Sequence, residues 1–329
     1  MKMARRIVIA GGSGLIGSQL ARHFADRKDD VIVLTRGKDR TSRGIQFVHW
    51  DPEDPKDLYE LLNDAHTVIG LSGASVDSRY TKARKWEIMH SRLASTWAIG
   101  DAIGKCEHPP QLWLQAGTAT IYRHAEDRPM DQFTGEPGKG FSVEVARTWE
   151  AAAKRSIEGC ETRLVLLRMA MVLSNAGGVL PKLQQIVRMG LGGKHASGEQ
   201  FVSWIHEKDL VRAIEHIMSS KTEGIYDLAA PEPVKDRLLM EMLRAQLRPW
   251  ISFPKPRWML EIGAWLMRTE TELILKSRRV VPTRLLNEGF EFRYPGISTA
   301  LVDLMRKQQS ATLAQRSLTS PQVLRHENL

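Results

Sequence analysis

The chain has 329 residues, of which 42% are hydrophobic, and a formal net charge of +9. Its length allows one large domain with an appendage or two domains, and no apolar run reaches the roughly 18 residues that a membrane-spanning helix needs. The two cysteines form no metal-ligand pattern and the basic residues are interspersed with acidic ones, so we expect a cytoplasmic protein that binds neither metal nor nucleic acid.

Strand-like and helix-like segments alternate from residue 6 to about residue 120. The predicted strands are the apolar runs at 6–10, 31–35, 45–50, 67–73 and 112–117. The predicted helices between them lie at 15–26, 55–63 and 81–104. This alternation predicts an α/β fold with parallel strands and helical crossovers on both faces, that is, a doubly wound sheet.

The second half of the chain is less regular. Residues 123–140 are polar and rich in glycine and proline, which predicts a long loop of the kind that often serves as a lid. The further predicted elements are a helix at 141–156, one buried strand at 162–173, and amphipathic helices at 237–248 and 257–267. We therefore predict a nucleotide-binding domain at 1–175 completed by parts of 200–230, substrate-side segments at 176–250, a small helical domain at 251–305 and a disordered tail at 306–329.

The first predicted strand runs into a cluster of glycines. The stretch RIVIAGGSGLIG, residues 6–17, has the spacing Gly11-x-x-Gly14-x-x-Gly17. In a dinucleotide-binding turn the first glycine allows the sharp turn, the second lets the backbone approach a pyrophosphate, and the third lets the helix pack against the sheet. The phosphates would lie at the positive end of helix 15–26. Glycines also mark ordinary turns, but a strand before and a helix after favour a dinucleotide site.

The residues after the second predicted strand favour NADP(H) over NAD(H). An acidic residue here would bind the free ribose hydroxyl of NAD, but the chain reads TRGKDR at residues 35–40. Arg36 can pair with a 2′-phosphate and lie against the adenine. Lys38 and Arg40 add positive charge. The alternative is a solvated basic loop.

Further stretches carry a resemblance to a known family. They are HWDP at 49–52, GLSGASV at 70–76, YTKARKWEIMHSR at 80–92, RMGLGGKHASGEQFVSWIHEKDL at 188–210, YDLAAPEPV at 226–234 and RRVVPTRLLNEGFEFRYP at 278–295. From residue 6 to about 305 the chain resembles an atypical extended short-chain dehydrogenase/reductase, and more narrowly the NAD(P)-dependent epimerase-like group called "epimerase family protein" or cell-division-inhibitor-like. The resemblance implies a seven-stranded parallel Rossmann sheet, a smaller substrate-side lobe and a small C-terminal domain.

The resemblance also implies which residues contact the cofactor. They belong to the glycine-rich turn, the end of the second strand, the third strand's exit and the turn after strand 67–73: Gly11, Gly12, Ser13, Gly14, Leu15, Ile16, Gly17, Thr35, Arg36, Asp51, Leu71, Ser72 and Gly73. Glu87 and Arg92 match a segment of the family that we expect to face the cofactor cleft. An ion pair on the helix surface is the alternative for these two residues.

Enzymes of the wider family normally carry a Ser or Thr after the fifth strand and a Tyr-x-x-x-Lys on the next helix, which together move a proton to or from the substrate. Here AGTATIYRH places Thr118 at the Ser/Thr position. The helix FSVEVARTWEAA places Ser142 at the tyrosine position and Ala146 at the lysine position, and neither can do that work. Members of the narrower group commonly lack the pair as well. Tyr122 is a candidate substitute acid, with a packing role as the alternative.

Four residues are candidates for contact with a substrate. Gln200, Trp204 and His206 lie in SGEQFVSWIHEKD, a stretch that faces the substrate in related folds. His206 is a candidate to bind or protonate a substrate, and the alternative is a buried structural histidine hydrogen-bonded near Asp209. Arg188 is a candidate to pair with an anionic group, or else lies at the surface. No group of His, Cys, Asp and Glu suggests a metal site.

Together these observations predict an NADP(H)-binding oxidoreductase or epimerase that acts on a small polar substrate, such as a sugar nucleotide. Thr118 would orient the substrate, and the proton donor is unassigned. The alternative is a non-catalytic NADP(H)-binding regulatory protein that acts through a protein partner, because the tyrosine and lysine are missing. The net charge is the single feature that favours nucleic-acid binding, and we do not expect such binding. A homodimer is compatible with the sequence.

Overall fold

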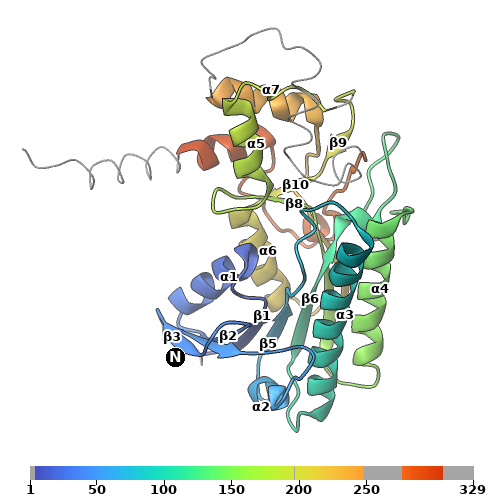
Figure 1. The fold of residues 1–329 in the computed structure, drawn as a ribbon. Helices are drawn as coiled ribbons and strands as arrows, with labels where there is room; N and C mark the ends of the chain where they lie inside the picture. The colour runs from blue at the N-terminus through green and yellow to red at the C-terminus, as the bar shows by residue number, and fades with distance from the viewer. Residues whose placement is uncertain (1–3, 196, 248–275, 307–329) are drawn as a thin grey trace, which may run out of the picture.

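An eight-stranded sheet forms the centre of the molecule (Figure 1). The computed structural model describes residues 4–195, 197–247 and 276–306 of the chain. The sheet strands are β1 (Arg6–Ala10), β2 (Asp30–Thr35), β3 (Arg40–Ser42), β4 (Ile45–His49), β5 (Thr67–Gly70), β6 (Leu112–Thr118), β7 (Arg163–Met169) and β11 (Gly224–Leu228). Seven run parallel, which confirms the predicted Rossmann sheet. The short edge strand β3 pairs antiparallel with β4 and was not predicted, because its three residues are polar and exposed.

The strand order of the sheet reverses between β1 and β5. From β1 the order runs through β2 and β4 to one edge, and from β5 it runs through β6 and β7 to β11 at the other side. In open parallel sheets, ligands bind beyond the carboxyl ends of the strands at such a reversal. The glycine-rich turn follows β1 and residues 71–73 follow β5, so the two predicted cofactor segments lie at this point.

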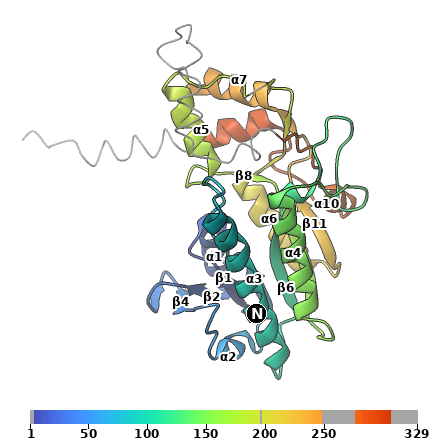
Figure 2. The same cartoon turned by 45° about the vertical axis from the view of Figure 1, so that its right-hand side comes forward.

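Helices cover both faces of the sheet (Figures 1 and 2). One face carries α1 (Leu15–Asp26) and α6 (Glu207–Ser219), and the other carries α2 (Leu58–Leu62), α3 (Lys82–Lys105) and α4 (Phe141–Ser156). Two helices are shorter. The helix η1 (Ala119–Ile121) directly follows β6, and α10 (Thr283–Asn287) lies in the C-terminal segment that is described from residue 276. Successive strand residues point to opposite faces, and helices cover both faces of the central strands β1, β2, β5 and β6, so these strands are continuous apolar runs.

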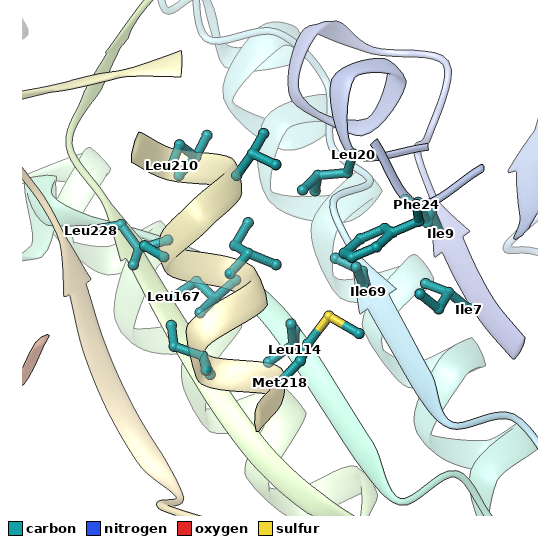
Figure 3. Close-up of a cluster of buried hydrophobic side chains, with 14 of the residues drawn as sticks. Ile7, Ile9, Leu20, Phe24, Ile69, Leu114, Leu167, Leu210, Met218 and Leu228 are labelled. Atoms are coloured by element: carbon teal, nitrogen blue, oxygen red, sulfur yellow. The ribbon is translucent and has the colours of Figure 1, made fainter. Parts of the chain in front are cut away.

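The core on the α1 and α6 face is shown in Figure 3. Phe24 of α1 and Leu210 and Met218 of α6 pack with strand residues such as Leu114 and Leu167. All five side chains are buried. Burial of apolar area stabilises the fold by about 25 cal/mol per Å², and this core therefore fixes the positions of the strand ends that carry the predicted site.

A second, smaller lobe lies beyond the carboxyl ends of the strands (Figure 1). It is built from α5 (Val179–Arg188), α7 (Asp236–Leu247), the helical residues 297–306, and two small sheets that pair β8 (Met171–Leu173) with β10 (Trp204–His206) and β9 (Phe201–Val202) with β12 (Val234–Lys235). The lobe has its own buried cluster, which includes Leu180, Leu239 and Leu301. Residues 297–306 thus join residues 171–247 in one body.

The predicted single strand at 162–173 is wrong, because the structure divides it into β7 and β8. The N–H of Ala170 donates to the carbonyl of Leu228 at 3.0 Å, whereas the N–H of Met171 donates to the carbonyl of Ser203 at 3.2 Å. The chain therefore leaves the central sheet at Ala170 and enters the second lobe. A continuous apolar run does not reveal which neighbour each residue pairs with.

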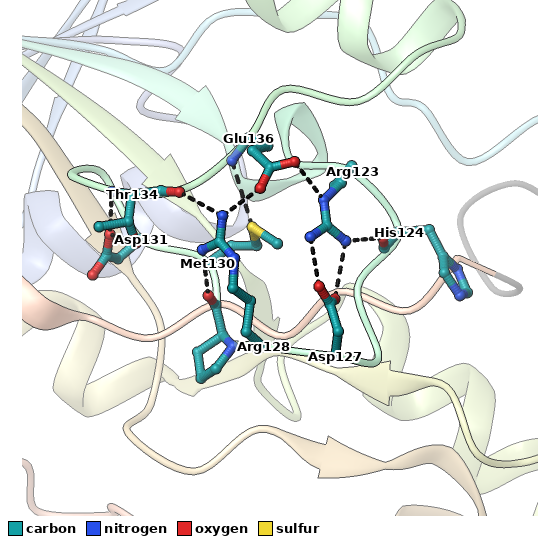
Figure 4. Close-up of polar contacts among 9 residues, drawn as sticks. Arg123, His124, Asp127, Arg128, Met130, Asp131, Thr134 and Glu136 are labelled. Carbon is teal, nitrogen blue, oxygen red and sulfur yellow. Dashed lines mark hydrogen bonds and ion pairs between the residues drawn. The ribbon is translucent and has the colours of Figure 1, made fainter.

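Residues 123–140 form the predicted long loop, and the loop is anchored at several points (Figure 4). Arg123 forms an ion pair with Glu136 across the loop, with 2.9 Å between Nε and Oε2. Met130 exchanges backbone hydrogen bonds of 2.7 and 3.0 Å with residues 279–281. These contacts tie the loop to the C-terminal segment.

Several predicted features lie outside the described residues. They are the amphipathic helix at 257–267, residues 251–275 of the predicted domain at 251–305, and all but the first residue of the tail at 306–329. Within the described ranges, no helix combines the length and the apolar character needed to cross a membrane.

Candidate cofactor and substrate site

The glycine-rich turn is packed so closely that three of its positions require glycine. Gly11 has a φ of +76°, and a Cβ on it would lie 2.9 Å from the backbone of Leu71. A Cβ on Gly12 would lie 2.8 Å from Cγ1 of Val33, and one on Gly17 would lie only 2.5 Å from Cα of Gly12. The fold itself therefore needs these three glycines, whatever binds at the turn.

Gly14 differs because it has open space beside it. A Cβ there would meet only the carbonyl oxygen of Gly11, at 3.4 Å, and its φ of −75° suits any residue. Gly14 is the N-cap of α1, and no side chain caps this end of the 12-residue helix. Ser13 is exposed beside it, while Leu15 and Ile16 are half-buried in the first turn. An uncapped helix end with room for an approaching group suits a phosphate.

Arg36 is exposed one residue beyond β2, the strand that pairs with β1. Within the described residues it makes no hydrogen bond or ion pair, so its guanidinium is available to a ligand. Its neighbour Thr35 accepts a hydrogen bond through Oγ1 from the N–H of Gly37 at 3.2 Å. Arg40 is engaged differently, because its guanidinium lies 4.2 Å from the centroid of the Phe47 ring.

The stretch after β5 borders the glycine-rich turn. The N–H of Leu71 donates to the carbonyl of Ala10 at 2.9 Å, and Leu71 and Ser72 are half-buried beside Gly11. Gly73 is exposed and lies against Arg92, since a Cβ on Gly73 would come within 3.0 Å of the guanidinium carbon. The structure thus brings together the glycine-rich turn, residues 71–73 after β5, and Arg92 of α3, all of which were predicted to form the cofactor site.

Two other predicted cofactor residues make local contacts. Asp51 is exposed, and its Oδ1 accepts a hydrogen bond from the N–H of Glu53 at 3.0 Å. Glu87 is exposed on α3 and forms an ion pair with Arg84, one turn earlier on the same helix. For Glu87 the geometry matches the alternative of an ion pair on the helix surface.

Arg92 is a half-buried cation beside these segments. Its Nη1 donates to the carbonyls of Ala74 at 3.0 Å and Ile88 at 2.9 Å, and its guanidinium carbon lies 5.0 Å from the Trp149 ring centroid. No carboxylate pairs with it among the described residues. Burial lowers the pKa of Arg92 to about 10, which leaves it charged at neutral pH. The surface ion pair weighed for Arg92 is therefore not formed.

Thr118 ends β6 and faces a cavity, while the positions of the missing pair are buried. Its Oγ1 accepts a hydrogen bond from the N–H of Thr120 at 3.2 Å. Ser142 is buried on α4, and its hydroxyl has no hydrogen-bond partner in the part of the chain that the structure describes. Ala146 is fully buried in the cluster under the η1 turn. Neither side chain offers a proton donor at the cavity.

The hydroxyl of Tyr122 is engaged in a buried network. It donates to the carboxylate of Asp227, at 2.8 and 2.9 Å from the two oxygens, and accepts from Nη1 of Arg168 at 2.9 Å. Arg168 also pairs with Glu150. Tyr122 is only 1% exposed, and burial raises its pKa. Burial also raises the pKa of Asp227 to about 7. This geometry matches a packing residue with a satisfied hydroxyl, not a proton donor to a substrate.

His206 is enclosed by the second lobe. Its side chain has no exposed surface, its ring stacks on Tyr294 at 3.9 Å, and its Nδ1 accepts a hydrogen bond from the N–H of Lys208. Burial lowers the pKa of His206 to about 4, so the ring is neutral at neutral pH. The expected neighbour Asp209 is not its partner, because that carboxylate accepts backbone N–H groups; Asp303 lies 3.3 Å from Nε2 instead. A covered ring cannot touch a substrate in this structure.

The other three predicted substrate residues do not line the cavity either. Trp204 is buried, and its Nε1 donates to the carbonyl of Glu232 at 3.0 Å. Gln200 is buried, and its Nε2 donates to the carbonyl of His195 at 3.0 Å. Arg188 is exposed in the last turn of α5. Gln200 and Trp204 therefore support the lobe from within.

A cavity of about 590 Å³ lies between the sheet and the second lobe. Thr118 to Thr120 and Met169 to Met171 line the sheet side, and residues of α5, β9 and α7 line the lobe side. Much of the lining is apolar, with Leu239 as an example from α7. Of the residues predicted from the sequence to form the site, Thr118 alone belongs to this lining.

Six charged or titratable residues of the lining were missed from the sequence: Asp77, Lys182, His195, Asp236, Lys276 and Arg278. They come from the stretch after β5, from α5 and the loop after it, from the start of α7 and from the segment before residue 279, and only the fold brings them together. His195 and Arg278 fall in the stretches that carry the family resemblance, but nothing in those stretches marks them as facing a cavity. Among the described residues, no three His, Cys, Asp or Glu side chains are grouped so as to hold a metal ion.

Comparisons with known proteins agree with this geometry. The model of the NAD dependent epimerase/dehydratase family matches residues 7–229. The chain belongs to this family. A domain of unknown function (DUF1731) matches residues 256–304, which confirms the expected C-terminal domain by sequence. A curated relative of this epimerase/dehydratase protein, Epimerase family protein SSP1921 of Staphylococcus saprophyticus, is 32% identical over 308 residues, covering 92% of this chain and 99% of the relative.

Solved structures of other proteins share the fold over more than 90% of this chain. The human epimerase family protein SDR39U1 (isoform 2), solved with NADPH, has a TM-score of 0.79 and 26% identity, covering 92% of this chain and 99% of that one. A nucleoside-diphosphate sugar epimerase from Corynebacterium glutamicum has a TM-score of 0.75 and 25% identity, covering 95% of this chain and 62% of that one.

The residues present fit the NAD(P) cofactor that the family implies. The open space at Gly14 and the uncapped end of α1 suit a pyrophosphate, which needs room for its oxygens and nearby N–H donors. The turn lies at the reversal of strand order between β1 and β5, where such cofactors bind.

Proposed function

We propose that this epimerase/dehydratase family protein binds NADP(H) in preference to NAD(H) and catalyses hydride transfer or epimerisation on a small molecule. The supporting observation is that the open turn at Gly14 and the cavity at Thr118 share the carboxyl edge of one sheet. Arg36 supports the preference for NADP(H), because an exposed and unengaged guanidinium beside the ribose position suits a 2′-phosphate.

The roles of the residues follow from their positions. Gly14 and the first turn of α1 would hold the pyrophosphate, and Leu71, Ser72 and Gly73, which lie beside the turn, would contact the cofactor. Arg92 adds positive charge beside Gly73. When bound, the nicotinamide supplies or accepts the hydride. Thr118 donates its hydroxyl hydrogen to the substrate oxygen and so orients the reacting carbon, and its contact with Thr120 fixes that hydroxyl.

The cavity favours a less polar substrate than the sugar nucleotide predicted from the sequence. Met169, Met171 and Leu239 line it, and such side chains gain little from a polyhydroxylated ring. The cavity lining does not support the predicted substrate contacts of four residues, because none of them belongs to it: Arg188, Gln200, Trp204 and His206.

Turnover of NADPH with a panel of small carbonyl compounds tests the proposal. We expect steady oxidation by the wild-type protein and a roughly tenfold to hundredfold lower kcat/KM for Thr118→Val, with an unchanged Kd for NADPH. Failure of the pure protein to bind any nicotinamide nucleotide would refute the proposal.

A second candidate function is a non-catalytic NADP(H)-binding regulator that acts through a protein partner. The burial of Ser142, Ala146 and Tyr122 favours it, because none of these side chains presents a proton donor to the cavity. This candidate predicts NADPH binding without turnover across the panel. NADPH oxidation that Thr118→Val abolishes would argue against it.

A further inference from the structure

The loop after α5 holds one imidazole at the cavity wall in a single orientation. The N–H of His195 donates to Oδ2 of Asp236 at 2.7 Å, and Nδ1 of its ring lies 2.8 Å from Oδ1 of the same carboxylate. The N–H of Asp236 donates to the carbonyl of Gln200 at 3.0 Å, and the side-chain amide of Gln200 donates to the carbonyl of His195. These hydrogen bonds fix both the backbone and the side chain of His195 to the start of α7.

The carboxylate determines which ring nitrogen carries the hydrogen. A carboxylate only accepts hydrogen bonds, so Nδ1 of His195 carries a hydrogen and donates it to Asp236. The neutral ring has no other N–H hydrogen. Its Nε2 therefore has a lone pair that can accept a hydrogen bond, and it has no hydrogen to donate.

Nε2 is the polar atom that His195 offers to a ligand in the cavity. His195 belongs to the cavity lining, and 19% of its side chain is exposed, compared with 6% of the Asp236 side chain. Within the described residues Nε2 makes no hydrogen bond, and it is not one of the side-chain atoms that are both buried and unpaired. A ligand in the cavity can therefore reach this nitrogen.

The charges of the lining decide which kind of ligand group suits Nε2. A carboxylate or phosphate meets a nitrogen that has no hydrogen to give. An ammonium group finds no free carboxylate in the described lining, because Asp236 accepts two hydrogen bonds from His195 and Asp77 forms an ion pair with Lys182. An uncharged hydroxyl, by contrast, can donate its hydrogen to the lone pair of Nε2.

Apolar side chains form much of the remaining lining. Met169 at the end of β7, Leu183 of α5 and Leu239 of α7 all line the cavity. An apolar chain gains free energy when it is buried against such side chains, whereas a hydroxyl that is buried without a partner loses it. A ligand with an apolar body and a hydroxyl group therefore suits both the apolar lining and the fixed acceptor.

We propose that His195, held by Asp236, binds the substrate by accepting a hydrogen bond at Nε2 from a substrate hydroxyl group. The substrate class is uncharged molecules with an apolar body and at least one hydroxyl group. This inference rests on the proposed function, because it adds a contact on the lobe side of the cavity whose sheet side carries Thr118.

Two isomers distinguish a hydroxyl group from other oxygen groups. 1-Octanol and heptyl methyl ether contain the same atoms, but the ether has no O–H. In calorimetric titration of the NADPH-saturated protein at about pH 8.5, where a histidine ring is ordinarily neutral, we expect 1-octanol to bind roughly tenfold more tightly. Without a fixed acceptor the order would be the reverse, because a hydroxyl loses more hydration than an ether oxygen. Equal binding of the isomers, or tighter binding of the ether, overturns the proposal.

Two charged probes test whether the substrate is uncharged. Octanoate and the octylammonium ion have the same chain length as 1-octanol, and both should bind more weakly than 1-octanol under the same conditions. Tighter binding of either ion overturns the assignment of an uncharged substrate.

Two variants test the hydrogen bond through the ring itself. His195→Asn keeps an amide donor near the Nδ1 position but lacks the Nε2 atom, so the preference for 1-octanol over the ether should be lost. Asp236→Asn changes the tautomer: its single oxygen accepts from the N–H of His195, its amide donates to Nδ1, and the ring hydrogen moves to Nε2. The ring then donates to either oxygen, so Asp236→Asn should bind the ether at least as tightly as 1-octanol. A merely structural role of this pair would weaken both isomers alike.

Arg237→Gln is the control on the neighbouring residue of α7. Arg237 pairs with Glu199 and does not line the cavity, so this variant should keep the wild-type preference. Each variant is compared at matched Tm and matched Kd for NADPH, and the two isomers on the wild-type protein decide the inference where a variant is unstable.

The outcomes separate this inference from the proposed function. An unchanged preference in both His195→Asn and Asp236→Asn, or an equal loss in Arg237→Gln, refutes the role of His195. Failure of the wild-type protein to bind NADPH refutes the proposed function instead. NADPH binding without a preference for 1-octanol over the ether refutes this inference alone.

Discussion

Replacement of Arg36 by alanine isolates the interaction that distinguishes NADPH from NADH. The proposed contact is a charge-assisted pair with the 2′-phosphate, a class of hydrogen bond that contributes about 1.5–3 kcal/mol. Arg36 is exposed, so screening by solvent places it near the lower end of that range. At about 1.4 kcal/mol per factor of ten, we expect Arg36→Ala to raise the Kd of NADPH roughly tenfold. The Kd of NADH should stay within about twofold, since it lacks the phosphate.

The assay is a titration followed by the fluorescence of the reduced nicotinamide at one fixed ionic strength, because salt screens exposed charges. Arg40→Ala is the matched control: it removes the same charge four residues further along the chain, at the start of β3, but the Arg40 guanidinium packs on Phe47. Arg40→Ala should change the NADPH affinity by less than about threefold if the contact is specific. Equal weakening of NADPH and NADH by Arg36→Ala, or no weakening of either, would refute the assignment of the 2′-phosphate to this residue.

Three further predictions rest on packing and burial. Gly17→Ala should lower Tm, because the new Cβ would lie 2.5 Å from the Cα of Gly12. Gly14→Ala should leave Tm within about 2 °C but weaken NADPH binding, because its Cβ only fills the space proposed for the phosphate. Equal effects of the two variants on Tm would contradict this prediction. The raised pKa of Asp227 means that the folded state holds its proton more tightly than the unfolded chain, so its contribution to stability is lost as the pH rises from about 4 to about 7. The stability of the wild type relative to Asp227→Asn should therefore fall across that window in urea denaturation, and a flat difference would count against it. Leu167→Ala in the fully buried core should cost about 2–5 kcal/mol by the same measurement, whereas Leu238→Ala, 41% exposed on α7, should cost less than about 1 kcal/mol.

Local sequence was sufficient for the elements whose residues interact with near neighbours. The strand at 6–10 and the helices at 15–26 and 141–156 have the bounds that their patterns predict. The glycine-rich turn could also be predicted from the sequence, because the close backbone contacts that require glycine there recur at a fixed spacing in the chain. Where the partner is distant, the same reasoning failed, as in the division of 162–173 between two sheets.

The candidate site also depends on contacts between residues that are distant in the sequence. The sequence determined the Rossmann sheet, the turn that suits a pyrophosphate and the absence of a tyrosine and lysine at Ser142 and Ala146. Only the tertiary structure decided that the Tyr122 hydroxyl is bound to Asp227, 105 residues away, and that His195 is fixed by Asp236, 41 residues away, at a cavity wall. The physical reason is that burial and charge at a site depend on which distant segments the fold brings into contact, and a residue's type and neighbours in sequence do not carry that information.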